Sequence, residues 1–231
     1  MTSRDVGEAS AASGRIIPFG DAAVMLTLAE RVDAGLAARA QAIAAAIHAA
    51  RAAEPGIRRP VPAHASVLVP FDPLAIELDA VTRLVATCAD TIGDVAIDAE
   101  PRSPIEIPVR YGGDDGPDLE DVAAVHDLRP SDVVELHAGA TYRVLFLGFA
   151  PGFAYLGGLP PGLVTPRKAT PRPRVPAGSV GIAGEQTGVY PLAMPGGWQL
   201  IGRTETVLWD VARPSPALLR PGDRVRFVPA R

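Results

Sequence analysis

The chain has 231 residues, of which 48% are hydrophobic and 21% charged, with a formal net charge of −4; these values allow one large domain or two modest ones with a substantial core. No apolar run is long enough to cross a bilayer and the N-terminus lacks the apolar segment of a signal peptide, so we expect a cytoplasmic protein with no membrane partner. Cys88 is the single cysteine, which excludes an internal disulfide, and the four histidines show no ligand spacing, so no bound metal is expected.

The first part of the chain alternates predicted strands and helices. Residues 16–28 read as a strand with a turn or bulge at Gly20 and Asp21, and Asp33 can cap the helix that follows. The pair Asp72 and Pro73 is typical of a helix start. We expect strands at residues 16–28, 66–71 and 105–111, and helices at 33–53, from 72 onward, at 119–126 and at 131–137. These elements predict an α+β sandwich in which helices cover one sheet.

From Tyr142 onward the pattern changes to short apolar runs between Gly and Pro turns, which favours an all-β barrel or sandwich. The runs lie at residues 144–147, 179–183, 189–193, 198–201, 207–210 and 225–228. We therefore predict a frayed N-terminus at residues 1–15, an α+β sandwich domain at 16–140 and a β-barrel domain at 141–231.

The charge is divided between these two parts. Residues 1–140 hold 11 Lys and Arg against 22 Asp and Glu, whereas residues 141–231 hold 11 against 4. The basic second part either meets an anion, such as a carboxylate, a phosphate or an acidic partner surface, or attracts the acidic first part.

The most distinctive stretch is VLFLGFAPGFAYLGGLP, residues 144–160. Its glycines and prolines restrict the backbone path, so that Phe149, Phe153 and Tyr155 form either a shaped aromatic wall for a substrate or a buried hairpin corner. We take these three aromatic residues as candidate substrate-binding residues.

A second stretch, TPRKATPRPR, carries cations in a segment stiffened by prolines. An extended path would spread Arg167, Lys168, Arg172 and Arg174 along a lip, and guanidinium groups suit carboxylate or phosphate. A solvated charged loop is the alternative. Nucleic acid is not expected as a partner, because no basic helix or aromatic RNA-binding pattern accompanies these cations.

Further polar side chains lie between the later strands. Gln186, Tyr190 and Arg203, beside Trp198, would suit a small amide or lactam with one carboxylate, or could be hydrogen-bonded corners of the β-structure. The segment GWQLIGRT approaches a phosphate-loop pattern, but it reads as a strand and not as a loop that opens a helix, so we do not expect it to bind a nucleotide.

His137 directly precedes the 144–160 stretch and is the candidate general acid or base. The alternative is a histidine that interacts with the carbonyls at a helix end. Since no Ser, His and Asp set can be justified from spacing, a stand-alone hydrolase is disfavoured.

The 144–160 stretch, together with ATPRPRVPAGSVGIAGEQTGVYPLAMPGGWQLIGRT and LLRPGDRVRF, resembles the KipI/PxpB family, which includes the B subunit of 5-oxoprolinase and is also called allophanate hydrolase subunit 1. The resemblance covers nearly the whole chain. It implies a cyclophilin-like barrel for the second part.

For activity, the resemblance implies a subunit of an ATP-dependent 5-oxoprolinase, which opens the lactam ring of 5-oxo-L-proline to L-glutamate. The site would be shared with a PxpC/KipA-like subunit 2, a PxpA-like third subunit would take part, and the complex would use ATP, so that the isolated chain would be inactive. Two rivals are a carboxyltransferase component of a urea-carboxylase-type enzyme and a KipI-like inhibitor that binds a sensor histidine kinase.

Overall fold

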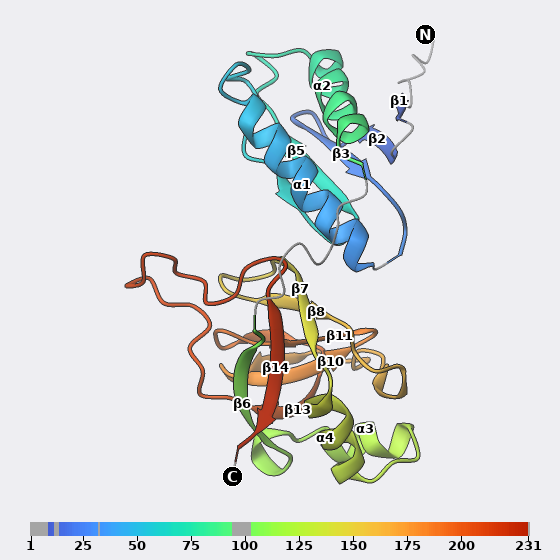
Figure 1. The fold of residues 1–231 in the computed structure, drawn as a ribbon, viewed down its shortest axis with the longest axis vertical. Coiled ribbons are helices and arrows are strands. Elements are labelled where there is room, and N and C mark those ends of the chain that lie inside the picture. The colour runs from blue at the N-terminus through green and yellow to red at the C-terminus, as the bar shows by residue number, and fades with distance from the viewer. Residues whose placement is uncertain (1–8, 12–13, 32, 94–102, 231) are drawn as a thin grey trace. The chain divides into compact units, whose positions relative to one another are not determined.

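A computed structural model describes residues 9–11, 14–31, 33–93 and 103–230 (Figure 1). Contacts within the chain divide it into two compact units, Met1–Ala99 and Glu100–Arg231. The described residues form four α-helices, a five-stranded sheet and a closed barrel of seven strands. The expected combination of helices with a β-barrel is therefore confirmed.

The first unit is an antiparallel sheet with two helices packed against one face (Figure 1). Its strand order is β1-β2-β3-β5-β4. Alternate strand residues such as Val24, Leu26 and Val67 point into the core beneath the helices. The elements are β1 (Ala9–Ala11), β2 (Gly14–Pro18), β3 (Ala23–Thr27), α1 (Ala34–Ala50), β4 (Val61–Pro62), β5 (Ser66–Pro70) and α2 (Leu78–Thr91).

Helix α1 begins where the sequence indicated. The Asp33 carboxylate accepts hydrogen bonds from the backbone N–H groups of Gly35 (2.8 Å) and Leu36 (3.0 Å), which satisfies two amides that lack partners within the helix. Ile43 and Ile47 lie fully buried one turn apart on the face that meets the sheet.

Helix α2 begins later than predicted. Asp72 does initiate a turn, since its carboxylate accepts from the Leu74 N–H at 3.1 Å and its carbonyl from Ala75 and Ile76, but the helix starts only at Leu78. Leu74, which falls inside the helix predicted from residue 72 onward, is 98% exposed. An aspartate followed by a proline marks a turn as readily as a helix.

The second unit is built on the barrel, whose strand order around the ring is β10-β11-β8-β7-β14-β6-β13. β14 runs parallel to β6, with Val225 opposite Ile105, and antiparallel to β7, so it closes the ring between an early strand and a middle one. The barrel strands are β6 (Ile105–Tyr111), β7 (Tyr142–Leu147), β8 (Ala154–Gly157), β10 (Ser179–Ala183), β11 (Gln186–Val189), β13 (Gln199–Arg203) and β14 (Arg224–Pro229).

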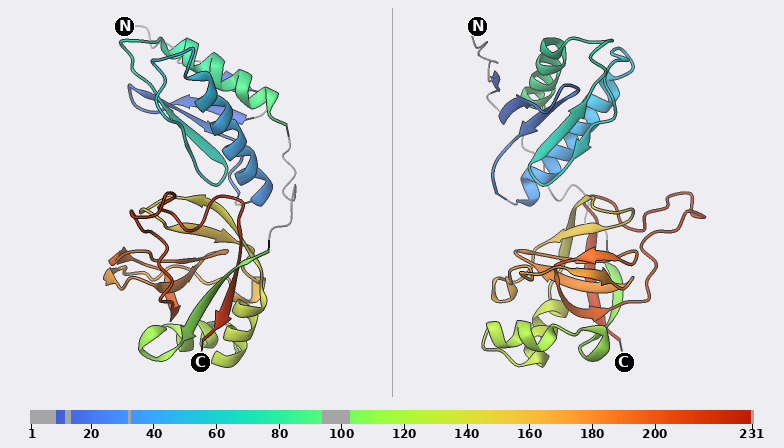
Figure 2. Two further views of the ribbon diagram at one scale, coloured as in Figure 1. Left: turned by 60° about the vertical axis from the view of Figure 1, so that its left-hand side comes forward. Right: turned by 180° about the vertical axis from the view of Figure 1, so that it is seen from behind.

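Helices α3 and α4 lie together at one end of the barrel (Figure 2), and a separate two-stranded sheet pairs β9 with β12. These elements, with two short 3-10 turns, are η1 (Gly113–Asp115), α3 (Leu119–Val125), α4 (Pro130–Gly139), η2 (Pro161–Leu163), β9 (Arg172–Val175) and β12 (Met194–Gly196).

The domain boundary predicted near residue 140 needs correction, because β6, α3 and α4 belong to the barrel unit. Ile107 and Val109 on β6 are fully buried in the same core as Val225 on β14. Alternation identifies a strand but does not say which sheet it joins. Of the frayed N-terminus predicted at residues 1–15, residues 9–11 and 14–15 lie in paired strands, and residues 1–8 and 12–13 fall outside the described part of the chain.

Candidate functional site

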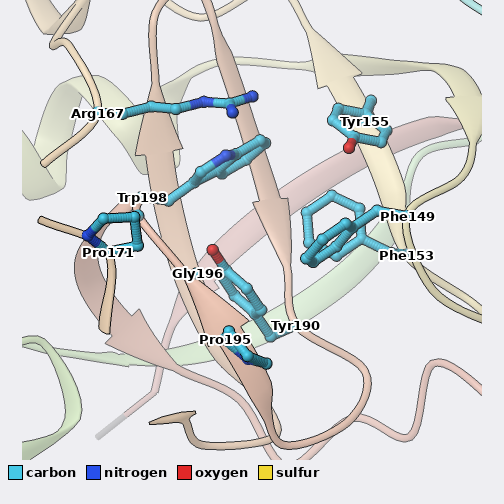
Figure 3. Close-up of a pocket in the computed structure, with 10 residues that line it drawn as sticks. Phe149, Phe153, Tyr155, Arg167, Pro171, Tyr190, Pro195, Gly196 and Trp198 are labelled. Atoms are coloured by element: carbon cyan, nitrogen blue, oxygen red, sulfur yellow. The ribbon is translucent and has the colours of Figure 1, made fainter. Parts of the chain in front are cut away.

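The barrel unit contains a pocket of about 300 Å³ (Figure 3). Arg167 and Trp198 lie on one side of it in this view, and Phe149, Phe153 and Tyr155 on the other. The lining residues come from the loop before β8, from β8, from the segment before β9, from the residue after β11, from β12 and from the turn between β12 and β13. They are Phe149, Phe153, Tyr155, Arg167, Pro171, Tyr190, Pro195, Gly196, Gly197 and Trp198.

Aromatic rings form the walls, and Phe153 is their centre. It is 1% exposed and packs edge-to-face with Phe149 (5.5 Å between ring centroids), Tyr155 (4.9 Å), Tyr190 (5.4 Å) and Trp198 (5.4 Å). Edge-to-face packing suits the ring quadrupoles and fixes the rings relative to one another. The rings are therefore fixed before a ligand arrives, and Phe149 and Tyr155, the two that are not buried, offer it apolar surface.

The turn before β8 places Phe149 at the rim of the pocket, where its side chain is 63% exposed. Phe149 has φ of 66°, and the Ala150 N–H donates to the Gly148 carbonyl at 2.7 Å, which makes a γ-turn. A β-turn follows, because the Phe153 N–H donates to the Ala150 carbonyl at 3.0 Å and Gly152 has φ of 79°. A positive φ at a bulky residue is strained, so this corner stores energy at the site.

Tyr190 is held from two sides. Its ring packs edge-to-face with Trp198, with 6.4 Å between the ring centroids, and Gly196 lies against it so closely that a Cβ there would come within 2.7 Å of the Tyr190 Cε1 atom. A glycine at this position lets the backbone approach the phenol. The close fit fixes the Tyr190 ring in the pocket wall.

Arg167 is the cation among the residues that line the pocket, and it lies at the lip. It is exposed, and no hydrogen bond or ion pair occupies its guanidinium among the described residues. Burial raises the pKa of Tyr155 and of Tyr190, and the positive charge of Arg167 opposes that rise. Both phenols therefore stay protonated at neutral pH and can donate hydrogen bonds.

The segment of residues 165–172, which we call the strap, carries Arg167 and is tied to neighbouring backbone. The Lys168 N–H donates to the Gly197 carbonyl at 2.7 Å, and the Gln199 amide donates to the Pro166 carbonyl at 3.0 Å. Arg167 thus lies between two anchored residues.

The strap is also tied by a buried carboxylate. Asp118, 2% exposed, accepts hydrogen bonds from Lys168 Nζ (2.9 Å), Arg172 Nη2 (2.6 Å) and the Leu200 N–H (2.7 Å). Burial alone would raise the pKa of Asp118, but these bonds outweigh it and hold the pKa below its usual value. Sequence reasoning missed Asp118: its place before α3 is typical of a helix cap, yet its side chain caps nothing there, and its partners lie about fifty residues away.

Five of the predicted site residues meet in this pocket: Phe149, Phe153, Tyr155, Arg167 and Tyr190. The other predicted substrate-binding residues do not line it. Arg172 binds Asp118, and Arg203 donates from Nε to the Ala177 carbonyl at 3.1 Å. Arg174 is exposed on β9, and Gln186 is buried in β11.

His137, the candidate acid or base, also lies outside the pocket lining. It is fully buried at the end of α4, where its ring stacks on Phe227 at 4.6 Å. Nδ1 lies 2.8 Å from the Tyr111 hydroxyl and Nε2 2.9 Å from Thr187 Oγ1. Since the Thr187 hydroxyl donates to the Gly181 carbonyl, Nε2 carries the proton and Nδ1 accepts from Tyr111.

These surroundings keep His137 neutral, because burial lowers its pKa to about 3. Its side chain does not contact the helix-end carbonyls either; the His137 carbonyl is instead bonded by the Tyr142 hydroxyl at 2.8 Å. His137 is a hydrogen-bonded core residue of the barrel.

The described ranges contain no group of three or more His, Cys, Asp or Glu side chains arranged to hold a metal ion. None of their helices has the length and apolar character needed to span a bilayer.

The single cysteine, Cys88, lies half-buried on α2, and burial raises the pKa of its thiol. A raised pKa makes it a poor nucleophile.

Comparison with known proteins adds family evidence. Residues 14–219 match the carboxyltransferase domain, subdomain C and D. The chain is 58% identical over 160 residues to the 5-oxoprolinase B subunit of Escherichia coli O157:H7, covering 69% of this chain and 72% of that protein. It is 43% identical over 225 residues to the 5-oxoprolinase B subunit of Bacillus subtilis strain 168, covering 93% and 92%.

A solved structure with the same fold is the Kluyveromyces lactis urea carboxylase. It is 25% identical with a TM-score of 0.76, and the match covers 94% of this chain but only 22% of that enzyme.

Proposed function

Because the chain belongs to the carboxyltransferase subdomain C and D family and, with its B-subunit homologues, to the KipI/PxpB family, we propose that it is the B subunit of an ATP-dependent 5-oxoprolinase. This enzyme would open 5-oxo-L-proline to L-glutamate. The proposal is tied to a site by the aromatic pocket, at whose lip the Arg167 guanidinium has no hydrogen-bond or ion-pair partner within the described part of the chain.

The pocket matches the chemistry of this substrate. The lactam ring is small and flat enough to lie against Phe149 and Tyr155, the aromatic residues of the lining that are not buried, and its carboxylate would pair with Arg167. The protonated phenols of Tyr155 and Tyr190 offer donors for the lactam carbonyl. The pocket therefore supplies binding and orientation for the ring.

The remaining chemistry would come from partner subunits in the cytoplasm. The segment that approaches a phosphate-loop pattern forms strand β13, so we place the ATP site on a PxpC/KipA-like subunit or a PxpA-like third subunit. The γ-phosphoryl group of ATP would pass to the lactam carbonyl oxygen with release of ADP. Water would then add to that carbon and the C–N bond would break to free the amine, and a second water would hydrolyse the resulting acyl phosphate to L-glutamate and phosphate. In this scheme the isolated chain binds the lactam but does not turn it over.

Replacement of Arg167 by alanine tests the pocket. A hydrogen-bonded pair of charges contributes about 1.5–3 kcal/mol, so Arg167→Ala should raise KM for 5-oxoproline about 10- to 100-fold. The measurement is ATP-dependent glutamate release by the complex reconstituted with its partner subunits.

Arg220→Ala is the matched control, since Arg220 is also an exposed arginine of the barrel unit but lies outside the pocket. It should leave KM unchanged. Equal KM values for the Arg167→Ala variant and the unmodified complex would contradict the placement of the substrate in this pocket. Full turnover by the chain alone would contradict the shared site.

The structural likeness to urea carboxylase favours a second candidate, a carboxyltransferase component. That role requires carboxylated biotin as the donor. Glutamate release that proceeds without bicarbonate and without a biotinylated carrier would decide for ring opening, whereas dependence on both would decide for carboxyl transfer.

A further inference from the structure

We propose that Asp118 is a positioning residue that sets the specificity of the pocket for a carboxylate-bearing lactam. By holding Lys168 and Arg172, it fixes the strap and leaves Arg167 as the cation that a ligand carboxylate can reach. The inference rests on the proposed function and adds a residue that does not itself touch the pocket.

Asp118 is itself rigidly attached to the barrel. Its N–H donates to the Leu200 carbonyl at 2.9 Å, and its Oδ2 accepts from the Leu200 N–H at 2.7 Å, so two bonds fix it beside β13. The preceding loop lies so close to this strand that a Cβ on Gly116 would overlap the Ile201 carbonyl. A carboxylate held in this way can act as a fixed anchor for groups that bind its other oxygen.

That other oxygen, Oδ1, accepts from both Lys168 Nζ at 2.9 Å and Arg172 Nη2 at 2.6 Å. These residues lie on either side of the exposed part of the strap, and Arg172 opens β9. Together with the backbone bonds of Pro166 and Lys168, they hold the strap at points before and after Arg167. The orientation of Arg167 therefore depends on Asp118.

The charges lead to the same conclusion. Lys168 and Arg172 are mostly buried, with side chains 29% and 26% exposed, so solvent screens them only partly. Asp118 is their anionic partner among the described residues, and Arg172 Nη1 is buried there without a hydrogen-bond acceptor. Loss of the Asp118 charge would leave two cations unneutralised and displace the strap.

The test compares two ligands in the reconstituted complex. 2-Pyrrolidinone has the lactam ring of 5-oxoproline but no carboxylate, so it uses the aromatic walls and not Arg167. Asp118→Asn keeps the size of the side chain and removes its charge. We expect KM for 5-oxoproline to rise about tenfold with kcat within about twofold, while the inhibition constant of 2-pyrrolidinone changes less than about twofold.

Asp115→Asn is the matched control, because Asp115 belongs to the same loop but pairs with Arg110 at 2.8 Å, away from the strap. It should change neither constant, and Asp118→Glu should partly restore the low KM. If Asp118→Asn does not fold, Lys168→Met is the second test, because it removes one hydrogen bond to the strap and leaves Asp118 paired with Arg172. It should raise KM for 5-oxoproline about threefold and leave the inhibition constant of 2-pyrrolidinone unchanged.

If Asp118→Asn raises KM for 5-oxoproline and the inhibition constant of 2-pyrrolidinone by the same factor, Asp118 has a general structural role and the inference is overturned. An unchanged KM for 5-oxoproline would overturn it as well. These outcomes differ from failure of the proposed function, in which Arg167→Ala itself leaves KM unchanged.

Discussion

His137 shows how the environment of a residue decides its role. A histidine just before the 144–160 stretch suggested acid–base chemistry, yet both of its ring nitrogens are engaged inside the barrel by Tyr111 and Thr187. Protonation of Nδ1 would require the Tyr111 hydroxyl to rotate its proton away and accept a hydrogen bond instead, and would place a charge on a fully buried ring. The ring therefore serves the stability of the barrel.

This arrangement gives a pH dependence of stability. The pKa of His137 is about 3 in the folded chain and about 6.5 when unfolded, so between these values the unfolded state binds a proton that the folded state does not. The contribution of neutral His137 to the free energy of unfolding is complete above about pH 6.5. It falls by about 1.4 kcal/mol per pH unit as the pH decreases toward 3. Urea unfolding from pH 7 to pH 4 measures it.

His137→Gln isolates this effect, because glutamine can still bond to Tyr111 and Thr187 but does not titrate. Its free energy of unfolding should fall less steeply with decreasing pH than that of the unmodified chain. Parallel curves for the two proteins would show that His137 has the same pKa in the folded and the unfolded chain, and would contradict the depressed value.

Residue chemistry in the site was only partly predictable. The aromatic residues were found because Gly and Pro residues surround them in a short stretch. Among the cations, Arg167 and Arg172 look alike in sequence. Only the position of Asp118 decides that Arg172 is paired, whereas Arg167 has no such partner in the ranges that the structure describes. That carboxylate approaches through tertiary structure, which local sequence does not encode.

At the scale of elements, the γ-turn at Phe149 places a strained backbone conformation at the rim of the pocket. We expect Phe149→Gly to be more stable than Phe149→Ala by about 1 kcal/mol, because both lack the ring but only glycine tolerates positive φ without cost. Thermal unfolding of the two variants measures the difference. Both should bind 5-oxoproline more weakly than the unmodified chain, and equal stability of the two variants would argue against strain.

Element prediction succeeded for apolar runs that lie in the barrel sheet and failed for runs that lie in turns and loops. The strands at 105–111 and 179–183 have the predicted bounds. The run at 189–193 is mostly a turn that carries Tyr190, and 207–210 holds only an isolated bridge between Trp209 and Ala217. Short apolar runs in loops that pack on a core resemble strands in sequence.

For the whole molecule, the barrel depends on its last strand. β14 joins β6 to β7, and Val225 and Phe227 are buried in the core. A chain that stops before Arg224 should lose the barrel, while the first unit, which has its own core, stays folded. Hydrogen exchange should then show protected amides in α1 and β3 and rapid exchange in β10 and β11.

Persistent protection of β10 and β11 in the shortened chain would contradict this dependence.

The fold class was predictable because composition and periodicity change along the chain. The division into units was not, because β6 pairs with strands far away in sequence, and such pairing depends on the complete barrel core.

The parallel pair of β6 and β14 also bears on how the protein is made. During translation β6 leaves the ribosome long before β14, its parallel partner. The first unit can fold while synthesis continues, but the open edge of β6 stays available to other chains until β14 emerges. Newly made protein is thus most exposed to aggregation, and most in need of chaperones, in the interval between the emergence of β6 and that of β14.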